Sequence, residues 1–524
     1  MCCRVGLASI RSVRISLPQS KLGQLGKDTD RSLNRREMAA MFNFLLLFFI
    51  LVAQITSATH ALLYKRDPKA AWAWIVTCML FPPIGPILYI LLGINRVRTR
   101  AQRLKWYWPM FRPGSDSPFD YARDNHSVLQ DARNILCKYI IPPHFHPIAY
   151  ISEAVTQRPL LGHNDIQALY NGEEAYPAML SAIHGAKHRI YLATYILATD
   201  KAGREIIEAL ASAVDRGVEV KVLVDAVGEF YSLPRTHKLL RRRGIPFARF
   251  LPVKLTSPSP FINLRNHRKL LIVDGATGFT GGMNIRDKHL TKDPENTYPT
   301  QDIHFRLQGS IVSQLEEIFL EDWGFTTGEH RQGLTAEVEG RGRSICRTVT
   351  VGPNQDLNKL SLILSGASSQ ASKSINIMTP YFLPTRELIG ALQSAALRGV
   401  EVNVVLPAKN NLPFVHWATR NMLWELLAYG VHIYYQPPPF AHTKLFVLDD
   451  YYTVLGSANL DPRSLRLNFE VVLEVYEEEF GKEMSDHIRA CIASSRMVTL
   501  KEVDSRPLAE RFRDSLCWLF SPYF

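Results

Sequence analysis

One short pattern occurs twice in this 524-residue chain and restricts its fold more than any other feature. In both copies a histidine, a lysine and an aspartate follow the spacing His-x-Lys-x-x-x-x-Asp: His267, Lys269 and Asp274, then His442, Lys444 and Asp449. The four residues between lysine and aspartate are apolar in each copy, which is typical of a buried strand. On a strand, residues two apart point to one face, so each copy presents its histidine and lysine together. A fold that joins the copies brings two of each into one site.

Two histidines in one site suit the exchange of a phosphodiester. A neutral imidazole attacks phosphorus while a protonated imidazole on the opposite side gives its proton to the departing alkoxide. The lysines, together with Asn284 and Asn459 at the ends of two Gly-x-x-Asn tails, are expected to hold the phosphoryl oxygens. Such preorganised donors contribute roughly 3–4 kcal/mol each. A single His-x-Lys is more typical of a solvated strand end, but two copies with matching tails favour catalysis.

On these motifs the chain resembles the phospholipase D superfamily, whose duplicated signature has this form. The run from Gly456 to Glu470, GSANLDPRSLRLNFE, is more narrowly similar to the bacterial type of cardiolipin synthase. The resemblance extends from about Phe42 to the C-terminus and leaves out residues 1–38. It implies an α/β fold: a pseudo-twofold pair of α/β/α sandwich halves, preceded by an N-terminal transmembrane helical hairpin.

The resemblance also implies an acid that orients each histidine from about thirty residues downstream. Glu470 lies 28 positions after His442 (470 − 442), and Asp302 lies 35 positions after His267 (302 − 267). These spacings pair Glu470 with His442 and Asp302 with His267. Because the N-terminal motif usually supplies the nucleophile in this superfamily, His267 is expected to attack phosphorus and His442 to donate the proton.

Three further expectations concern the site. Asp274 and Asp449 stand at strand ends and are expected to hold the strand-turn geometry, although they belong to the catalytic signature. Ser457, in the second Gly-x-x-Asn tail, is a weaker candidate for a phosphate ligand. No metal or cofactor is expected, because the paired lysines supply the positive charge.

A second repeat indicates two α/β units. The pattern strand, helix, strand is predicted twice, at 190–195, 203–215 and 218–224 and again at 375–378, 386–397 and 400–406. Both predicted helices end in Arg-Gly-Val-Glu-Val, which places Gly217 and Gly399 as helix C-caps. The two Arg-Gly-Val-Glu-Val copies lie 182 positions apart (398 − 216) and the motif histidines 175 (442 − 267), so the repeat is unequally interrupted.

Two apolar stretches, 42–63 and 70–94, precede these units. Each is long enough to cross roughly 30 Å of hydrocarbon at 1.5 Å per residue, which predicts a membrane hairpin kinked at Pro82, Pro83 and Pro86. The alternative is a cleaved signal peptide followed by a buried core helix. Basic residues flanking the hairpin favour both of its ends in the cytoplasm, with Trp106 to Trp108 at the headgroup level.

The predicted organisation has six parts: a basic, disordered tail (1–38), the hairpin (39–95), a linker or interfacial segment (96–150), the first half (151–330), a junction (331–350) and the second half (351–524). At the C-terminus, residues 512–524 combine aromatic and basic side chains. Two interpretations stay open for this segment: it caps the core, or it lies in the lipid interface.

Composition restricts the partner and the compartment. The net charge of +12 indicates an anionic partner, either phospholipid or nucleic acid, and charge alone does not decide between them. The seven cysteines are scattered, odd in number and without metal-ligand spacing, which indicates reduced thiols. The membrane hairpin favours lipid, so nucleic acid is not expected.

These observations predict a membrane-bound phosphatidyltransferase that forms cardiolipin and glycerol from two phosphatidylglycerol molecules through a phosphohistidine. Phosphatidylglycerol and anionic membrane lipid are the expected partners, and homo-oligomerisation is left open. The expected location is the bacterial cytoplasmic membrane, with the catalytic part facing the cytoplasm. Three alternatives are a phospholipase D-type hydrolase that makes phosphatidic acid, a nucleic-acid phosphodiesterase and a non-catalytic scaffold. The two intact motifs argue against the scaffold.

Overall fold

The computed structural model describes residues 19–65, 68–93, 141–252, 264–329, 340, 342–353 and 358–521. The chain divides into two compact units, residues 1–102 and 103–524. The predicted aromatic belt at Trp106 to Trp108 lies outside the described residues, as does most of the predicted linker 96–150.

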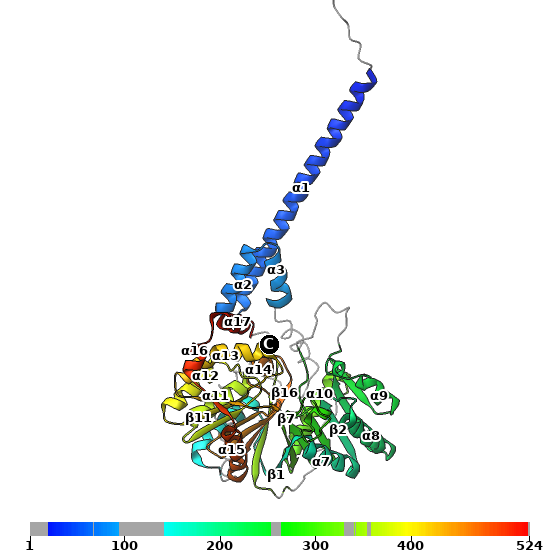
Figure 1. The fold of residues 1–524 in the computed structure, drawn as a ribbon. Helices are drawn as coiled ribbons and strands as arrows, with labels where there is room; N and C mark the ends of the chain where they lie inside the picture. The colour runs from blue at the N-terminus through cyan, green and yellow to red at the C-terminus, as the bar shows by residue number, and fades with distance from the viewer. Residues whose placement is uncertain are drawn as a thin grey trace, which may run out of the picture. The chain divides into compact units, whose positions relative to one another are not determined.

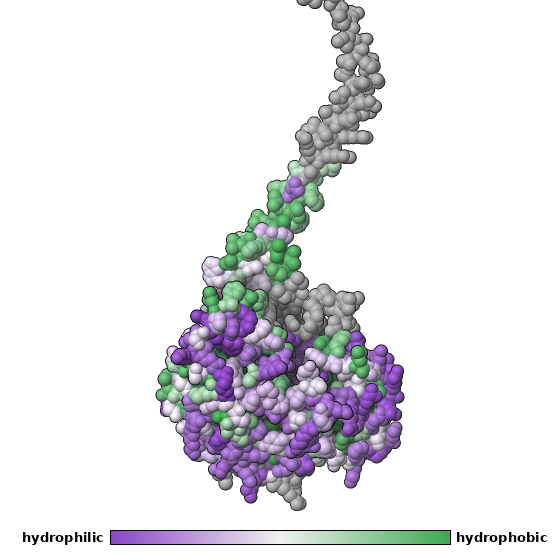
Figure 2. All heavy atoms as spheres, in the orientation of Figure 1, coloured by the Kyte–Doolittle hydropathy of each residue, from purple (hydrophilic) through white to green (hydrophobic). Residues whose placement is uncertain are grey.

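The first unit is built on one long helix, α1 (Gln19–Tyr64). Within the described residues, Ala40–Tyr64 is the one segment that is long and apolar enough to cross a membrane. Its hydrophobic residues stand out in green in Figure 2, in contrast to the largely hydrophilic surface of the second unit. Residues 19–38, for which disorder was expected, continue this helix, since each residue added to an existing helix gains a backbone hydrogen bond.

The second apolar stretch is broken into short helices. α2 (Pro68–Leu80) ends before Pro82 and Pro83, and α3 (Ile84–Leu88) and the π-helix η1 (Tyr89–Gly93) follow. Proline lacks the N–H that would continue a helix, so the predicted kink is here a break. The 13 residues of α2 measure about 20 Å, which is shorter than the hydrocarbon core. α2 still packs on α1, where the Gln54 side chain donates to the carbonyls of Cys78 and Met79 at 3.0 and 2.9 Å.

The second unit is organised around one sheet of fifteen strands in which the two halves repeat each other (Figure 1). Outward from the centre, the first half contributes β1 (Leu161–Tyr170), β8 (Ile303–Gln308), β6 (Thr277–Gly281), β5 (Leu270–Val273), β2 (Arg189–Thr194), β3 (Glu219–Asp225) and β4 (Phe247–Phe250). The second half contributes β9 (Ser344–Val351), β16 (Glu470–Tyr476), β15 (Tyr452–Gly456), β14 (Leu445–Leu448), β10 (Ser374–Met378), β11 (Glu401–Pro407), β12 (His432–Gln436) and β17 (Arg496–Val498). β1 and β9 pair antiparallel at the centre, which joins the halves into one sheet.

Helices cover both faces of this sheet, as an α/β/α sandwich requires. The first half carries α7 (Asn171–Gly185), α8 (Lys201–Asp215), α9 (Thr236–Arg242) and α10 (Ile311–Thr327). The second carries α11 (Lys359–Gln370), α12 (Arg386–Leu397), α13 (Pro413–Leu427), α14 (Pro462–Arg466), α15 (Glu478–Ala493), α16 (Leu500–Asp504) and α17 (Leu508–Leu519). One hydrophobic cluster includes Phe305 and Leu315 of the first half with Phe480 of the second. The predicted α/β fold with two similar halves is confirmed.

The predicted helix ends are confirmed, but two predicted boundaries move. Gly217 and Gly399 follow α8 and α12 with φ of +83° and +88°, the left-handed conformation that suits glycine at a helix end. The junction 331–350 overlaps β9, so the second half begins within it. The linker 96–150 also ends early, because Phe145 and α6 (His146–Thr156) pack into the core of the second half.

Candidate active site

The two motifs meet in the second unit. His267 and Lys269 lie directly before β5, and His442 and Lys444 lie directly before β14. The charges of Lys269 and His267 both lower the pKa of His442, after burial and Lys444, so the two motifs are within electrostatic reach of each other. The sequence prediction that one fold joins both copies is therefore confirmed.

Main-chain pairing fixes which residues become neighbours. The His267 amide donates to the Phe469 carbonyl at 2.9 Å. β13 (Phe440–Ala441) of the second half pairs with β7 (Thr300–Gln301) of the first, and the His442 amide donates to the Gln301 carbonyl at 2.7 Å. Phe469 and Gln301 each come directly before an acid in the sequence. Each histidine is thus placed beside the acid of the other half.

The side chains follow this crossing. Nδ1 of His442 lies 2.8 Å from Oδ2 of Asp302, and Nδ1 of His267 lies 3.3 Å from Oε1 of Glu470. The pairing expected from sequence, Glu470 with His442 and Asp302 with His267, is wrong. The reason is topological: Asp302 comes directly before β8, Glu470 is the first residue of β16, and these two strands flank the central strands β1 and β9. The acids therefore stand at the boundary between the halves.

Burial is the main influence on the charges of the site. It lowers the pKa of His267, against an opposing effect from Glu470, and it lowers the pKa of His442 well below the usual value, with Lys444 as the next cause. Burial also lowers the pKa of Lys269 and that of Lys444, the latter to about 8. Both imidazoles are consequently neutral at neutral pH, and a neutral imidazole is the form that attacks phosphorus.

The two lysines are held by their own histidines. Nζ of Lys269 donates to the His267 carbonyl at 2.5 Å, and Nζ of Lys444 donates to the His442 carbonyl. Nζ of Lys444 also lies 3.0 Å from Nδ1 of His442. Nζ of Lys444 lies 3.2 Å from Nε2 of His442 as well, so its three donors all face His442, whereas the contact of Lys269 with the His267 carbonyl uses one of its three.

The asparagines follow two constrained glycines. Gly281 and Gly456 end β6 and β15 with φ of +151° and +147°. A Cβ at Gly456 would lie 2.4 Å from the Val471 carbonyl oxygen, so a larger residue does not fit there. Asn284 accepts a hydrogen bond from the Ile196 amide at 3.3 Å, and Nδ2 of Asn459 lies 3.3 Å from the Ser464 hydroxyl.

Ser457 is engaged with the main chain. Its hydroxyl accepts from the Val471 amide at 3.0 Å and donates to the Val471 carbonyl at 3.2 Å. These bonds hold the strand that begins at Glu470. A role of Ser457 as a phosphate ligand stays a prediction.

The motif aspartates lie at the other ends of β5 and β14, away from the histidines. The Asp274 carboxylate accepts from the amides of Lys187, His188 and Arg189 at 2.8 to 2.9 Å. Asp449 does the same for the amides of residues 372–374 at 2.7 to 2.9 Å. Through these contacts both aspartates hold the turn that follows their strand, as expected from the sequence. The structure does not bring these carboxylates to the histidines.

A buried network that the sequence patterns did not predict lies next to His267. Arg268 donates to Asp322 at 2.6 Å and to the Glu470 carbonyl at 3.1 Å, and Asn266 donates to Asp322 at 2.9 Å. This network ties the first motif to the strand that carries its acid. The available signal was Arg268 itself, a basic residue inside the motif, where the second copy has Thr443. Its partner Asp322 is 54 positions away and had no such signal.

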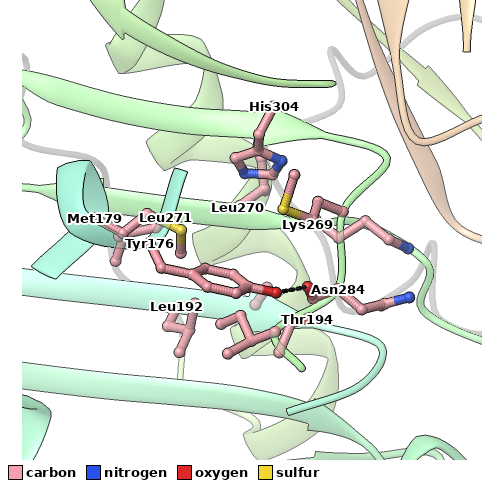
Figure 3. A pocket seen from close by; sticks show the side chains of 12 residues that line it. Tyr176, Met179, Leu192, Thr194, Lys269, Leu270, Leu271, Asn284 and His304 are labelled. Atoms are coloured by element: carbon pink, nitrogen blue, oxygen red, sulfur yellow. Dashed lines mark hydrogen bonds between the residues drawn. The ribbon is translucent and has the colours of Figure 1, made fainter. Parts of the chain in front are cut away.

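A small pocket lies behind the first motif. Figure 3 shows Lys269 and Asn284 pointing to the same side of it, with His304 on another wall and the Tyr176 hydroxyl bonded to the Asn284 carbonyl at 3.0 Å. Burial lowers the pKa of His304 to about 4, so this imidazole is neutral. Within the described residues, no group of three His, Cys, Asp or Glu side chains is placed to hold a metal ion.

Comparisons with known proteins agree with this geometry. The family model "Cardiolipin synthase, PLD-like domain" matches residues 179–323 and 366–492, and the model "Phospholipase_D-nuclease N-terminal" matches residues 43–93. The major cardiolipin synthase ClsA of Bacillus subtilis is 32% identical over 464 residues, which cover 87% of this chain and 94% of that protein. Cardiolipin synthase 1 of Staphylococcus epidermidis is 31% identical over 473 residues, 87% of this chain and 93% of that protein.

A solved structure shares the fold. Phosphatidylserine synthase of Haemophilus influenzae matches with a TM-score of 0.57 at 16% identity, over 72% of this chain and 100% of that one. At this identity the likeness concerns the fold alone. The family model and the relatives also show the family, because the model matches both motifs and the relatives match most of the chain in sequence. The chain belongs to the cardiolipin synthases of the phospholipase D superfamily, a family of enzymes with two phospholipase D-like domains.

Proposed function

We propose that the chain is a membrane-bound phosphatidyltransferase that converts two phosphatidylglycerol molecules into cardiolipin and glycerol. The observation that carries the proposal is the crossed pair of histidine–acid contacts, His442 with Asp302 and His267 with Glu470. Each acid contacts Nδ1, so neither acid occupies Nε2; Nε2 of His442 lies 3.2 Å from Nζ of Lys444. Two such imidazoles in one site are what a double displacement at phosphorus requires.

In the first proposed step, Nε2 of His267 attacks the phosphorus of one phosphatidylglycerol. The bond from phosphorus to the headgroup glycerol oxygen breaks, and His442 gives its proton to that oxygen. Glycerol leaves, and the phosphatidyl group stays on His267. In the second step, His442 takes a proton from the glycerol hydroxyl of another phosphatidylglycerol. This oxygen attacks phosphorus, the bond to His267 breaks, and cardiolipin forms.

The electrostatics support this division of roles. Burial favours the neutral form of both imidazoles, which suits His267 for attack. A bound phosphodiester adds negative charge next to His442 and so raises the pKa of the imidazole that must carry the proton. Lys269, Lys444, Asn284 and Asn459 are proposed to bind the phosphoryl oxygens, and no cofactor takes part.

The membrane supplies both substrates. The apolar segment Ala40–Tyr64 anchors the enzyme, and we propose that α2 and α3 complete a hairpin whose two ends face the cytoplasm. The proposed location is the bacterial cytoplasmic membrane. Tethering the site to the bilayer makes lipid the locally concentrated donor and also the locally concentrated acceptor. Glycerol dissolves in water while cardiolipin stays in the bilayer, so the two products separate.

Lys444 leads to a pH prediction. Its pKa of about 8 means that the ammonium is present below pH 8 and is lost as the pH rises through this value. Since the ammonium binds the phosphoryl oxygens, kcat/KM is expected to fall above pH 8, by about tenfold per pH unit once Lys444 is neutral. Bound substrate favours the charged lysine, so the fall in kcat should come at higher pH. Profiles of both constants between about pH 6 and 10 test this. Lys444→Arg keeps the charge and should move the fall in kcat/KM upward; an unmoved profile would contradict the assignment.

The decisive experiment for the proposed function is a product analysis. Purified full-length protein in detergent is incubated with phosphatidylglycerol alone, and the lipid and water-soluble products are identified by mass. Equal amounts of cardiolipin and glycerol are expected, with no change on adding a chelator. Phosphatidic acid as the main product would show that the enzyme hydrolyses phosphatidylglycerol and does not transfer the phosphatidyl group. Cleavage of single-stranded DNA, with lipid unchanged, would favour the nuclease alternative.

A further inference from the structure

The C-terminal helix α17 is attached to the second unit by its polar side. Asp514 is fully buried and pairs with Arg506 and with Arg513, the latter at 2.8 Å. Arg420 of α13 lies 2.7 Å from Glu510. The Arg513 guanidinium also stacks over the Trp417 ring at 4.4 Å. Ion pairs from Arg420 to Glu510 and Asp514 and the cation–π contact hold the polar side of this helix on α13, and Cys517 packs against the core.

The opposite side of α17 carries a continuous apolar stripe that faces solvent. The stripe consists of Leu508, Phe512, Leu516, Leu519 and Phe520, which are 81%, 70%, 47%, 64% and 52% exposed. Intervals of four, four and three residues place the first four on one face of a helix. A helix that caps a core turns such a face inward. α17 turns it outward, so its apolar face does not contribute to a cap.

We propose that the stripe is a lipid-contact surface that lies in the interface of an anionic phospholipid bilayer. A contiguous patch of exposed apolar residues on a water-soluble domain marks an interaction site. The same chain carries a segment, Ala40–Tyr64, that can cross a membrane, so bilayer is always within its reach. Exposed Arg511 borders the stripe, and basic residues beside an apolar face are typical of interfacial helices on anionic lipid. The choice of lipid rests on the anchoring and substrate proposed above.

Charge argues against a second copy of the chain as the occupant. Each copy carries a net charge of +12, so two copies repel each other, and each stripe would bring its own Arg511 into the contact. An anionic lipid surface instead complements Arg511 and covers the apolar residues at once. It would also hold the second unit at the membrane by a contact that is separate from the transmembrane segment.

Photolabelling of the full-length protein tests the inference. The protein is reconstituted in vesicles of phosphatidylcholine and phosphatidylglycerol that contain a phospholipid with a photoactivatable group near the headgroup. After illumination, labelled peptides are mapped by mass. Residues 508–520 are expected to carry lipid label at least about tenfold above the segment around Leu397, which is also exposed, at 70%. Label no higher than at Leu397 would overturn the proposal, as would chain-to-chain crosslinks through α17.

A matched pair of variants adds a functional readout. The double variant Phe512→Ser, Leu519→Ser removes two residues of the stripe, and Leu397→Ser removes an exposed apolar side chain elsewhere. The double variant is expected to raise KM for vesicular phosphatidylglycerol about tenfold, with kcat on a water-soluble short-chain analogue unchanged. Leu397→Ser should leave both unchanged. An unchanged KM in the double variant would contradict the proposal that the stripe contacts lipid. If label appears on 508–520 but no cardiolipin is formed, the proposed reaction fails and the lipid contact stands.

Discussion

His267→Ala is expected to abolish cardiolipin formation, with a loss of at least about 10⁴-fold in kcat. The reason is that His267 is the proposed nucleophile, whereas His442, the other imidazole of the site, is proposed to transfer protons and the asparagine amides are poor nucleophiles. His442→Ala removes the proton donor and is expected to cost about 10²- to 10⁴-fold. The measurement is the initial rate of cardiolipin formation from phosphatidylglycerol in detergent.

The two histidine variants should also differ in what they trap. With phosphatidylglycerol labelled at phosphorus, His442→Ala is expected to accumulate labelled protein, because the acceptor hydroxyl is no longer deprotonated for the second step. His267→Ala should carry no label. Exposed His184 provides a control, since His184→Ala should leave rate and labelling unchanged. Label retained on the His267→Ala protein would reverse the assigned roles.

Asp302→Asn is the second variant with a large expected effect, a loss of about 10³- to 10⁴-fold in kcat. The carboxylate contacts Nδ1 of His442 at 2.8 Å and holds the tautomer with Nε2 free to exchange protons. An amide at this position can donate to Nδ1 and so favours the wrong tautomer. Both side chains have nearly the same size, so the buried position should tolerate the change, and the thermal unfolding midpoint serves as the folding control.

The crossed contacts make this prediction specific. Asp302→Asn should behave like His442→Ala and accumulate labelled protein, because Asp302 supports His442. Glu470→Gln should behave like His267→Ala and carry little label, because Glu470 supports His267. The two acid variants are therefore controls for each other. If each acid served the histidine of its own half, the two labelling results would be exchanged.

Much of the local structure could be predicted from the sequence. Alternating apolar runs and the two Arg-Gly-Val-Glu-Val copies located β2, α8 and β3 and their counterparts β10, α12 and β11. Local patterns also placed Gly217 and Gly399 at helix ends and the motif aspartates at strand turns. These features depend on residues close together in the chain, where periodicity and backbone conformation carry the information.

The acid pairing could not be predicted, because it depends on the order of strands in the sheet. Spacings of 28 and 35 residues show that each acid follows a histidine but not which histidine it meets. The partners of His442 and His267 lie 140 residues before and 203 residues after them (442 − 302 and 470 − 267). The break in the second apolar stretch was not predicted either. Its composition suits a membrane span, but its first helix ends at Leu80, before Pro82 and Pro83.

The exchange of acids between the halves has a consequence for biosynthesis. A nascent chain that has emerged from the ribosome only as far as Thr327 contains His267, the proposed nucleophile, but neither Glu470 nor His442, the proposed proton donor. On the proposed roles, such an unfinished polypeptide is expected to lack transferase activity. Activity is expected only once β16, which begins at Glu470, has been added to the sheet.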